Sequence, residues 1–179
     1  DIHGARGWSM MTADIFWCNT STWREVQVAL DHHMQLFDQH STLLASLADS
    51  RADNFWALNP IMDDLCAATC PYCIDPCCLH ADVRYDFRDL LFLHCRQQAL
   101  PVHQPRLQAG QTCLFLSSAG CVLPRDMRPF LCTWYLCPRQ MNMIRQAFPS
   151  GSADLLPRLQ RMQQLRKDLE ATFIHLVTF

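Results

Sequence analysis

Apolar residues recur at three- and four-residue steps in the first part of the chain. The steps run through Trp23, Val26, Leu30, Met34 and Phe37 and continue through Leu43, Leu44 and Leu47. This spacing predicts an amphipathic helix over about 22–48, either continuous or broken near His40-Ser41. Asn59-Pro60 is typical of a helix cap followed by proline at the first helical position, so a short helix is expected to run from there into Cys66. Residues 1–20 show no period and are expected to form an N-terminal arm.

The C-terminal stretch carries the most regular apolar stripe. Its members predict an amphipathic helix over 154–178, and they are Leu155, Leu159, Met162, Leu165, Leu169, Phe173 and Leu176. Four basic residues are expected on the solvent side of this helix: Arg158, Arg161, Arg166 and Lys167. The stripe is expected to pack against the 22–48 helix, and a helix that binds a protein partner is the alternative.

Prolines interrupt the region 66–140, at positions 71, 76, 101, 105, 124, 129 and 138. At that density they forbid long regular elements. The exceptions are a helix over Asp86–Gln98, with Asp86 as a cap and Asp89 on a solvated face, and a small hairpin in which 113–116 and 121–123 flank 117–120. The predicted fold is therefore mainly α. It is a single compact domain over 21–179, with two long flanking helices around an irregular Cys-rich centre and a minor β-hairpin.

The composition argues against several classes of protein. The chain has 179 residues, half of them hydrophobic, with 15 Lys and Arg against 17 Asp and Glu. That balance lacks the basic excess of a general nucleic-acid binder. No apolar run approaches the length of a membrane span, and five glycines argue against a phosphate-binding loop. The first thirty residues lack a secretory pattern, and no nucleic-acid or membrane partner is expected from the composition.

Cysteine is the outlier, with eleven residues in the chain: Cys18, Cys66, Cys70, Cys73, Cys77, Cys78, Cys95, Cys113, Cys121, Cys132 and Cys137. A disulfide framework suits small secreted chains that lack a core, whereas this chain is larger and its count is odd. Thiolate ligation of metal predicts short chelate spacings, and residues 66–78 supply five cysteines. The spacing therefore favours metal, although it does not say which one.

The ordered cysteines resemble a known family. The pattern consists of Cys70-x2-Cys73-x3-Cys77-Cys78, then Cys113-Leu-Phe-Leu, Gly120-Cys121-Val-Leu-Pro124 and Arg128-Pro129-x2-Cys132-x2-Tyr135-x-Cys137. It resembles the YkgJ-like (CxxCxxCC) family of zinc- or iron-chelating proteins, although three residues stand before Cys77 where the usual signature has two. The resemblance implies a cytoplasmic, mostly bacterial metal-binding module with eight cysteine ligands. Flagellin lysine N-methylases carry a similar pattern, thought to hold an iron–sulfur cluster.

These eight cysteines are the expected ligands of an iron–sulfur cluster or, as the alternative, of zinc: Cys70, Cys73, Cys77, Cys78, Cys113, Cys121, Cys132 and Cys137. Redox or group-transfer chemistry would accompany a cluster. Arg125, Arg128 and Arg139 are placed in the sequence to balance thiolate charge. The roles of Cys18, Cys66 and Cys95 stay open.

Three other functions fit parts of the pattern. One is an adaptor stabilised by structural zinc that docks through the C-terminal helix. Another is a thiol redox protein using Cys70 and Cys73, since Cys-Pro-Tyr-Cys is similar to glutaredoxin sites. The third is a radical S-adenosylmethionine enzyme, because Cys66-x3-Cys70-x2-Cys73 matches its cluster motif. The proline-rich sequence after that motif does not alternate strands and helices as such enzymes do.

Overall fold

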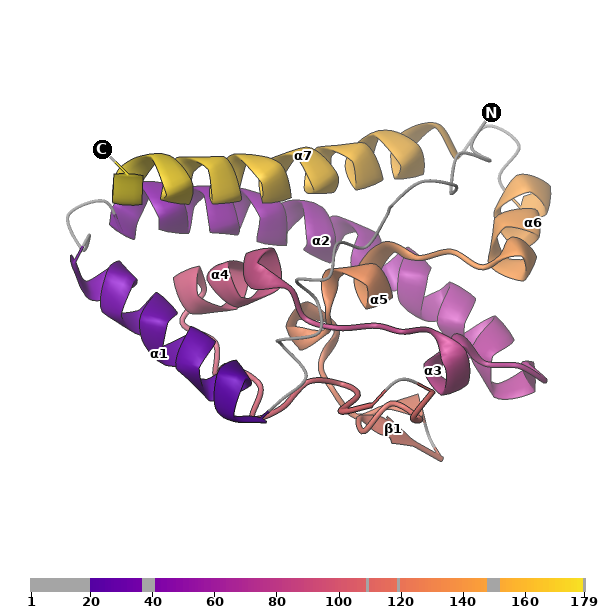
Figure 1. Cartoon of the computed structure of the whole chain (residues 1–179). Coiled ribbons are helices and arrows are strands. Elements are labelled where there is room, and N and C mark those ends of the chain that lie inside the picture. The colour runs from indigo at the N-terminus through magenta and orange to yellow at the C-terminus, as the bar shows by residue number, and fades with distance from the viewer. Residues whose placement is uncertain (1–19, 37–40, 109, 119, 148–151, 179) are drawn as a thin grey trace.

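The computed structural model describes residues 20–36, 41–108, 110–118, 120–147 and 152–178 (Figure 1). Its helices are α1 (Thr20–Leu36), α2 (Ser41–Thr69), α3 (Cys77–His80), α4 (Phe87–Cys95), α5 (Phe130–Trp134), α6 (Pro138–Ala147) and α7 (Ser152–Thr178), with 3-10 turns η3 (Cys70–Tyr72) and η4 (Arg125–Met127). Strands β1 (Leu116–Ser117) and β2 (Gly120–Cys121) form the small antiparallel hairpin. The prediction of a mainly α fold with a minor hairpin is confirmed. Cys18 and the rest of 1–19 lie outside the described residues.

The two longest helices, α2 and α7, lie side by side and run in opposite directions (Figure 1). Near the start of α2, Leu44 and Ala48 share a buried cluster with Leu169 and Phe173 of α7. Further along, a second cluster joins 55–65 of α2 to 155–162 of α7. The predicted C-terminal helix is therefore confirmed. Its apolar stripe is covered mainly by α2, whose first turns belong to the predicted 22–48 helix.

The predicted 22–48 helix is divided, because α1 ends at Leu36 and α2 begins at Ser41. The prediction that Asn59-Pro60 starts a new helix is wrong, since Pro60 lies inside α2. Proline has no N–H for the Trp56 carbonyl, and an interior proline costs about 3 kcal/mol. Burial offsets that cost here, because Leu58 and Met62 on either side of Pro60 belong to the same apolar cluster. The helix therefore continues through the proline.

Helix α4 is the element predicted over 86–98. Asp86 caps it, since its carboxylate accepts from Asp89 N at 3.1 Å and Asp89 reaches back to Asp86 N. The prediction that Asp89 lies on a solvated face is wrong, because its side chain is only 4% exposed. The solvent-side prediction for Arg166 is wrong as well, since Arg166 Nη2 lies 3.2 Å from Asp89 Oδ1 in the interior. A buried charge needs a buried partner, and apolar spacing alone does not reveal that pairing.

A polar network also fixes the loop after α4. The Gln104 amide accepts from Tyr85 N at 2.8 Å and donates to Tyr85 O at 3.0 Å. Tyr85 donates its hydroxyl to Met127 O at 2.6 Å, and Trp23 Nε1 donates to Pro101 O at 2.9 Å. These bonds satisfy buried polar groups in a segment with no regular structure. They hold the irregular centre against α1 and α4.

No helix among the described residues has the length and apolar character needed to cross a membrane.

Candidate metal centre

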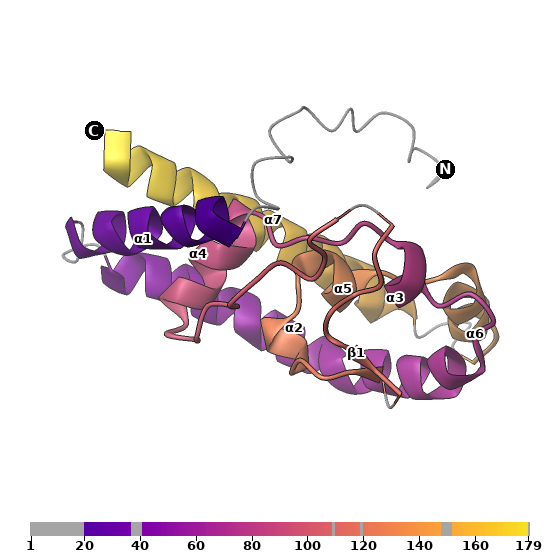
Figure 2. The ribbon, with the colours of Figure 1, turned by 60° about the horizontal axis from the view of Figure 1, so that its bottom comes forward.

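None of the ten cysteines in the described residues forms a disulfide. Cys70, Cys73, Cys77 and Cys132 are exposed, and the other six are half-buried. Both views place α3, β1 and α6 toward the end of α2 that carries Thr69 (Figures 1 and 2). The elements that hold or adjoin Cys77, Cys78, Cys121 and Cys137 therefore lie toward this end of α2.

One set of thiols lies at the end of α2, and we call it the α2-end group: Cys66, Cys70 and Cys137. The thiols of Cys66 and Cys70 interact, so that Cys70 lowers the pKa of Cys66 to about 5 while the pKa of Cys70 itself is raised. Gln140 connects these to Cys137. Its Nε2 lies 3.8 Å from Cys66 Sγ, and its backbone N lies 3.5 Å from Cys137 Sγ.

The second set lies on the loops and short helices, and we call it the loop group: Cys77, Cys78, Cys113, Cys121 and Cys132. Cys113 N donates to Cys78 O at 3.2 Å, and Cys121 pairs with Leu116 in the hairpin that follows. Although Cys132 is exposed as a whole residue, desolvation by the atoms around its thiol raises its pKa to about 12, and the thiolates of Cys121, Cys113 and Cys77 raise it further. Charges act on one another in this way when they lie near each other. The fold therefore brings both halves of the cysteine pattern into one neighbourhood.

Arg106 holds the loop group together from inside. Its side chain is almost completely buried, and its guanidinium donates to the carbonyls of Cys78 at 2.8 Å and Leu79 at 3.3 Å. It also donates to Gln111 O, two residues before Cys113. One guanidinium thus joins the backbone on both sides of the Cys78–Cys113 contact. Sequence reasoning missed Arg106 because nothing in its local pattern marks it as buried.

Within the loop group, Cys77 is the thiol that interacts with the α2-end group. Cys78 lowers the pKa of Cys77 to about 6, and the charge of Cys66 opposes that shift. Cys77 in turn raises the pKa of Cys70. Cys73 belongs to neither group by any contact, although its backbone N donates to Cys70 O at 3.2 Å. The two groups are therefore neighbours within one Cys-rich surface.

The three arginines named from the sequence occupy different places. Arg125 is buried, pairs with Asp63, and has its Nη2 3.6 Å from Cys66 Sγ. Arg128 donates from Nε to Leu123 O at 3.0 Å, and its charge lowers the pKa of Cys132. Arg139 is exposed on α6. Two of the three thus lie where a cation would balance thiolate charge.

The donor chemistry fits a thiophilic metal, but the side chains do not form a closed shell. Within the described ranges, no three His, Cys, Asp or Glu side chains are placed to hold one ion together. Two pairs of neighbouring thiols instead shift each other's pKa, Cys66 with Cys70 and Cys77 with Cys78. Ligands of structural metals rarely adopt their final arrangement before the metal binds. Side-chain rotation and closure of the loops would therefore have to accompany metal uptake.

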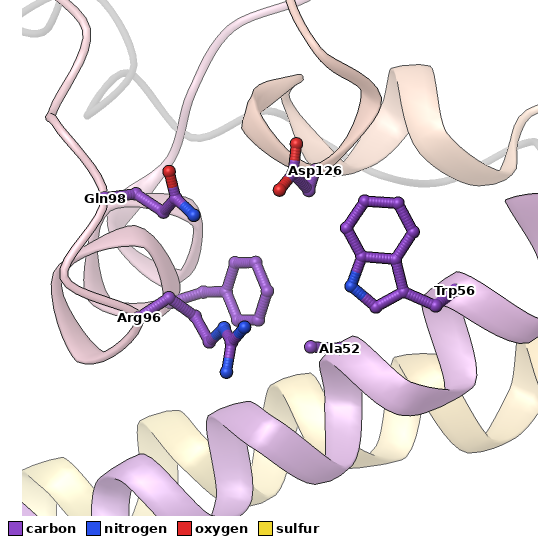
Figure 3. Close-up of a pocket in the computed structure, with 6 residues that line it drawn as sticks. Ala52, Trp56, Arg96, Gln98 and Asp126 are labelled. Atoms are coloured by element: carbon purple, nitrogen blue, oxygen red, sulfur yellow. The ribbon is translucent and has the colours of Figure 1, made fainter.

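A shallow hollow lies elsewhere, between α2, α4 and η4 (Figure 3). Its lining residues are Ala52, Trp56, Phe92, Arg96, Gln98 and Asp126, and none of them is a cysteine. Arg96 also pairs with Asp49 on α2. The hollow therefore offers no thiol chemistry and is separate from the candidate metal centre.

Comparison with models of known protein families gave no match, and neither the curated proteins nor the solved structures gave a significant match. The resemblance to the YkgJ-like family stays a hypothesis that rests on the order and spacing of the cysteines.

Proposed function

We propose that this chain is a cytoplasmic Cys-rich metal-binding protein whose thiolates hold an iron–sulfur cluster, with zinc as the alternative. One observation carries the proposal. Cys78 and Cys113 belong to the two separate halves of the cysteine pattern, and they share a backbone hydrogen bond of 3.2 Å. A metal site made from both halves requires such a meeting. The ligands would come from the eight cysteines named from the sequence, together with any neighbour that the fold adds.

The electrostatics of the loop group supports the proposal. Thiolates at Cys113 and Cys121 oppose the ionisation of Cys132. A bound cation would replace that repulsion with attraction, because metal coordination deprotonates thiols outright. Soft thiolates also select zinc and iron–sulfur clusters over hard cations such as magnesium.

The irregular backbone supports it as well. The longest regular element between Cys73 and Cys137 is α4 (Phe87–Cys95). Ordering such a segment costs about 1–2 kcal/mol of backbone entropy per residue. Structural zinc supplies on the order of 10 kcal/mol in small domains. A metal that cross-links the loops would offset part of the entropy that their order costs.

When bound, an iron–sulfur cluster would supply electron transfer or chemistry at an exposed iron, whereas zinc with four thiolates would be structural. The exposure of Cys70, Cys73, Cys77 and Cys132 leaves a path from solvent to the thiols. Arg125 and Gln140 would donate to sulfur, and Arg106 would hold the loops.

Anaerobic purification followed by elemental analysis and visible absorption tests the proposal. A broad charge-transfer band with iron and sulfide supports a cluster, and a colourless sample with stoichiometric zinc supports the alternative. In a matched pair, Cys113→Ser should lower the metal content and Cys95→Ser should not. A reduced wild-type protein that carries no transition metal above background would overturn the proposal.

Two other sequence hypotheses gain less support. A redox pair of Cys70 and Cys73 needs a thiol of depressed pKa, but Cys66 raises the pKa of Cys70. An adaptor docking through α7 cannot use the apolar stripe of that helix, because α2 covers it. We therefore favour metal binding as the function.

A further inference from the structure

Cys66 lies outside the eight cysteines of the family-like pattern, but two side-chain N–H groups approach its sulfur. It stands in the last turn of α2, and Cys70 follows one turn later, where η3 begins. Residues four apart lie on the same face of a helix, so the two thiols point to the same side. Thr69 Oγ1 lies 3.9 Å from Cys70 Sγ and accepts a hydrogen bond from Gln140 Nε2, the same nitrogen that lies 3.8 Å from Cys66 Sγ. Together they form a potential two-thiolate chelate at a helix end.

Two N–H donors from distant parts of the chain point at Cys66. Arg125 Nη2 approaches its sulfur to 3.6 Å, and Gln140 Nε2 approaches it to 3.8 Å. Arg125 is only 6% exposed and Gln140 only 4%, so both donors are held in place by the surrounding protein. Hydrogen bonds to coordinating sulfur tune and stabilise thiolate-bound metals. The surroundings of Cys66 are therefore those of a ligand.

Gln140 extends this arrangement to a third sulfur. Its Oε1 accepts from Cys137 N at 3.1 Å, its backbone N approaches Cys137 Sγ at 3.5 Å, and its Nε2 also donates to Thr69 Oγ1 at 3.0 Å. One buried glutamine thus joins the end of α2 to the start of α6. Cys66 and Cys137 are on the two sides of that connection.

We propose that Cys66 is an additional thiolate ligand, acting with Cys70 from the end of α2 and with Cys137 from the start of α6. This inference rests on the proposed metal-binding function and assigns it a ninth cysteine. Cys95 provides the contrast. It is also outside the eight, but it packs against the buried cluster of α1, α4 and α7, and burial alone raises its pKa to about 12. The two extra cysteines thus have different roles.

The test compares Cys66→Ser with Cys95→Ser in the full chain, freed of metal and reloaded anaerobically with Co2+ or Zn2+. The intensity of the sulfur-to-cobalt charge-transfer band counts thiolates, and competition with a chelator gives Zn2+ affinity. Cys66→Ser should lose one thiolate's share of the band and at least about tenfold in affinity, the loss caused by removing even an outer-sphere partner. Cys95→Ser should keep both values.

A measurement on the unmodified protein avoids any dependence on how the variants fold. Alkylation read by mass spectrometry should show Cys66 protected when Zn2+ is bound and reactive when it is removed, while Cys95 shows no change. If the protein binds metal but Cys66 alkylates equally in both states and Cys66→Ser keeps its cobalt band, the inference is wrong and the proposed function stands. If the wild type binds neither Co2+ nor Zn2+ and carries no cluster, both fail.

Discussion

Arg166 on α7 donates to Asp89 on α4 across 3.2 Å, with the two side chains only 8% and 4% exposed. Arg51 of α2 lies 3.9 Å from the same carboxylate, and Phe130 N of α5 donates to it at 3.3 Å. Four helices therefore meet at one buried carboxylate. Because Phe130 opens the short helix that carries Cys132, this network also sets where that cysteine lies.

Replacing Asp89 with Ala should therefore destabilise the protein by about 3–5 kcal/mol, because two arginines would lose their buried counter-charge. The measurement is the free energy of unfolding in urea. Asp82→Ala is the matched control, since Asp82 pairs with Arg84 but its side chain is 48% exposed. An exposed pair contributes about 0–1 kcal/mol. Equal small effects of both substitutions would show that the buried network adds little to stability.

Tyr85 should make the stability of the protein depend on pH in the alkaline range. Burial raises the pKa of its hydroxyl above the ordinary value of 10.0. Above pH 10 the unfolded chain ionises at this tyrosine while the folded chain keeps its proton, so stability falls as the pH rises from 10 toward the folded pKa. Tyr85→Phe should be about 1 kcal/mol less stable at pH 8, where it lacks the bond to Met127 O. That deficit should shrink above pH 10.

Urea unfolding of both proteins between pH 8 and pH 11 measures this difference, and comparing them cancels the titration of the shared cysteines. Tyr135→Phe serves as the control, because Tyr135 is 44% exposed. A deficit for Tyr85→Phe that stays constant over the whole range would contradict the assignment.

Arg106 should matter to both stability and metal retention. In Arg106→Met the carbonyls of Leu79 and Gln111 lose this donor, while the carbonyl of Cys78 keeps the bond from Cys113 N. Unpaired buried acceptors cost about 1–3 kcal/mol each, so a loss of at least about 2 kcal/mol is expected. Thermal unfolding and metal analysis after gel filtration are the two measurements. The exposed Arg139, replaced by Met, should change neither, and the idea fails if the two variants behave alike.

Arg125 should control the reactivity of Cys66 in metal-free protein. Cys70 makes the largest contribution to the lowered pKa of Cys66, and Arg125 adds to it through its hydrogen bond and its charge. Arg125→Met should raise that pKa and slow alkylation of Cys66 at pH 6, by roughly twofold for the first unit of increase and approaching tenfold for each further unit, once the thiol is mostly protonated. Site-resolved mass spectrometry measures the rate. Arg128→Met, whose Nε bonds Leu123 O, should leave the rate at Cys66 unchanged.

The sequence was most informative where a period or a short signal is local. The stripe of α7, the Asp86 cap and the 116–121 hairpin follow from residues within a few positions of one another. Pro60 shows the limit, because a local proline signal was overruled by burial against α7, a helix far away in the sequence. Arg166 and Asp89 show it too, since charge patterns cannot indicate that two residues meet in the interior.

The candidate site divides in the same way. Spacing favoured a metal site and the family resemblance implied the eight cysteines as its ligands, and that assignment stays a prediction. Two residues around the site could not be predicted from the spacing of the cysteines. Arg106 acts through carbonyls on two separate loops, and Gln140 bridges sulfurs from α2 and α6. The Cys66-x3-Cys70 interval was the one available signal for Cys66, and it gains meaning only once α2 is known to continue to Thr69.

Helix α2 is packed unevenly along its length. Its buried apolar residues up to Leu65 belong to the buried clusters that α2 shares with α7, whereas the last turn, 66–69, extends toward the thiols. Pro60 already removes one main-chain hydrogen bond from the helix. Local unfolding of α2 that begins at Thr69 would therefore stop near Pro60. Loss of metal would then loosen the end of α2 at Thr69, while the rest of α2 stays packed against α7. In hydrogen exchange of the metal-free protein, the amides of α2 after Pro60 should accordingly exchange faster than the amides before it.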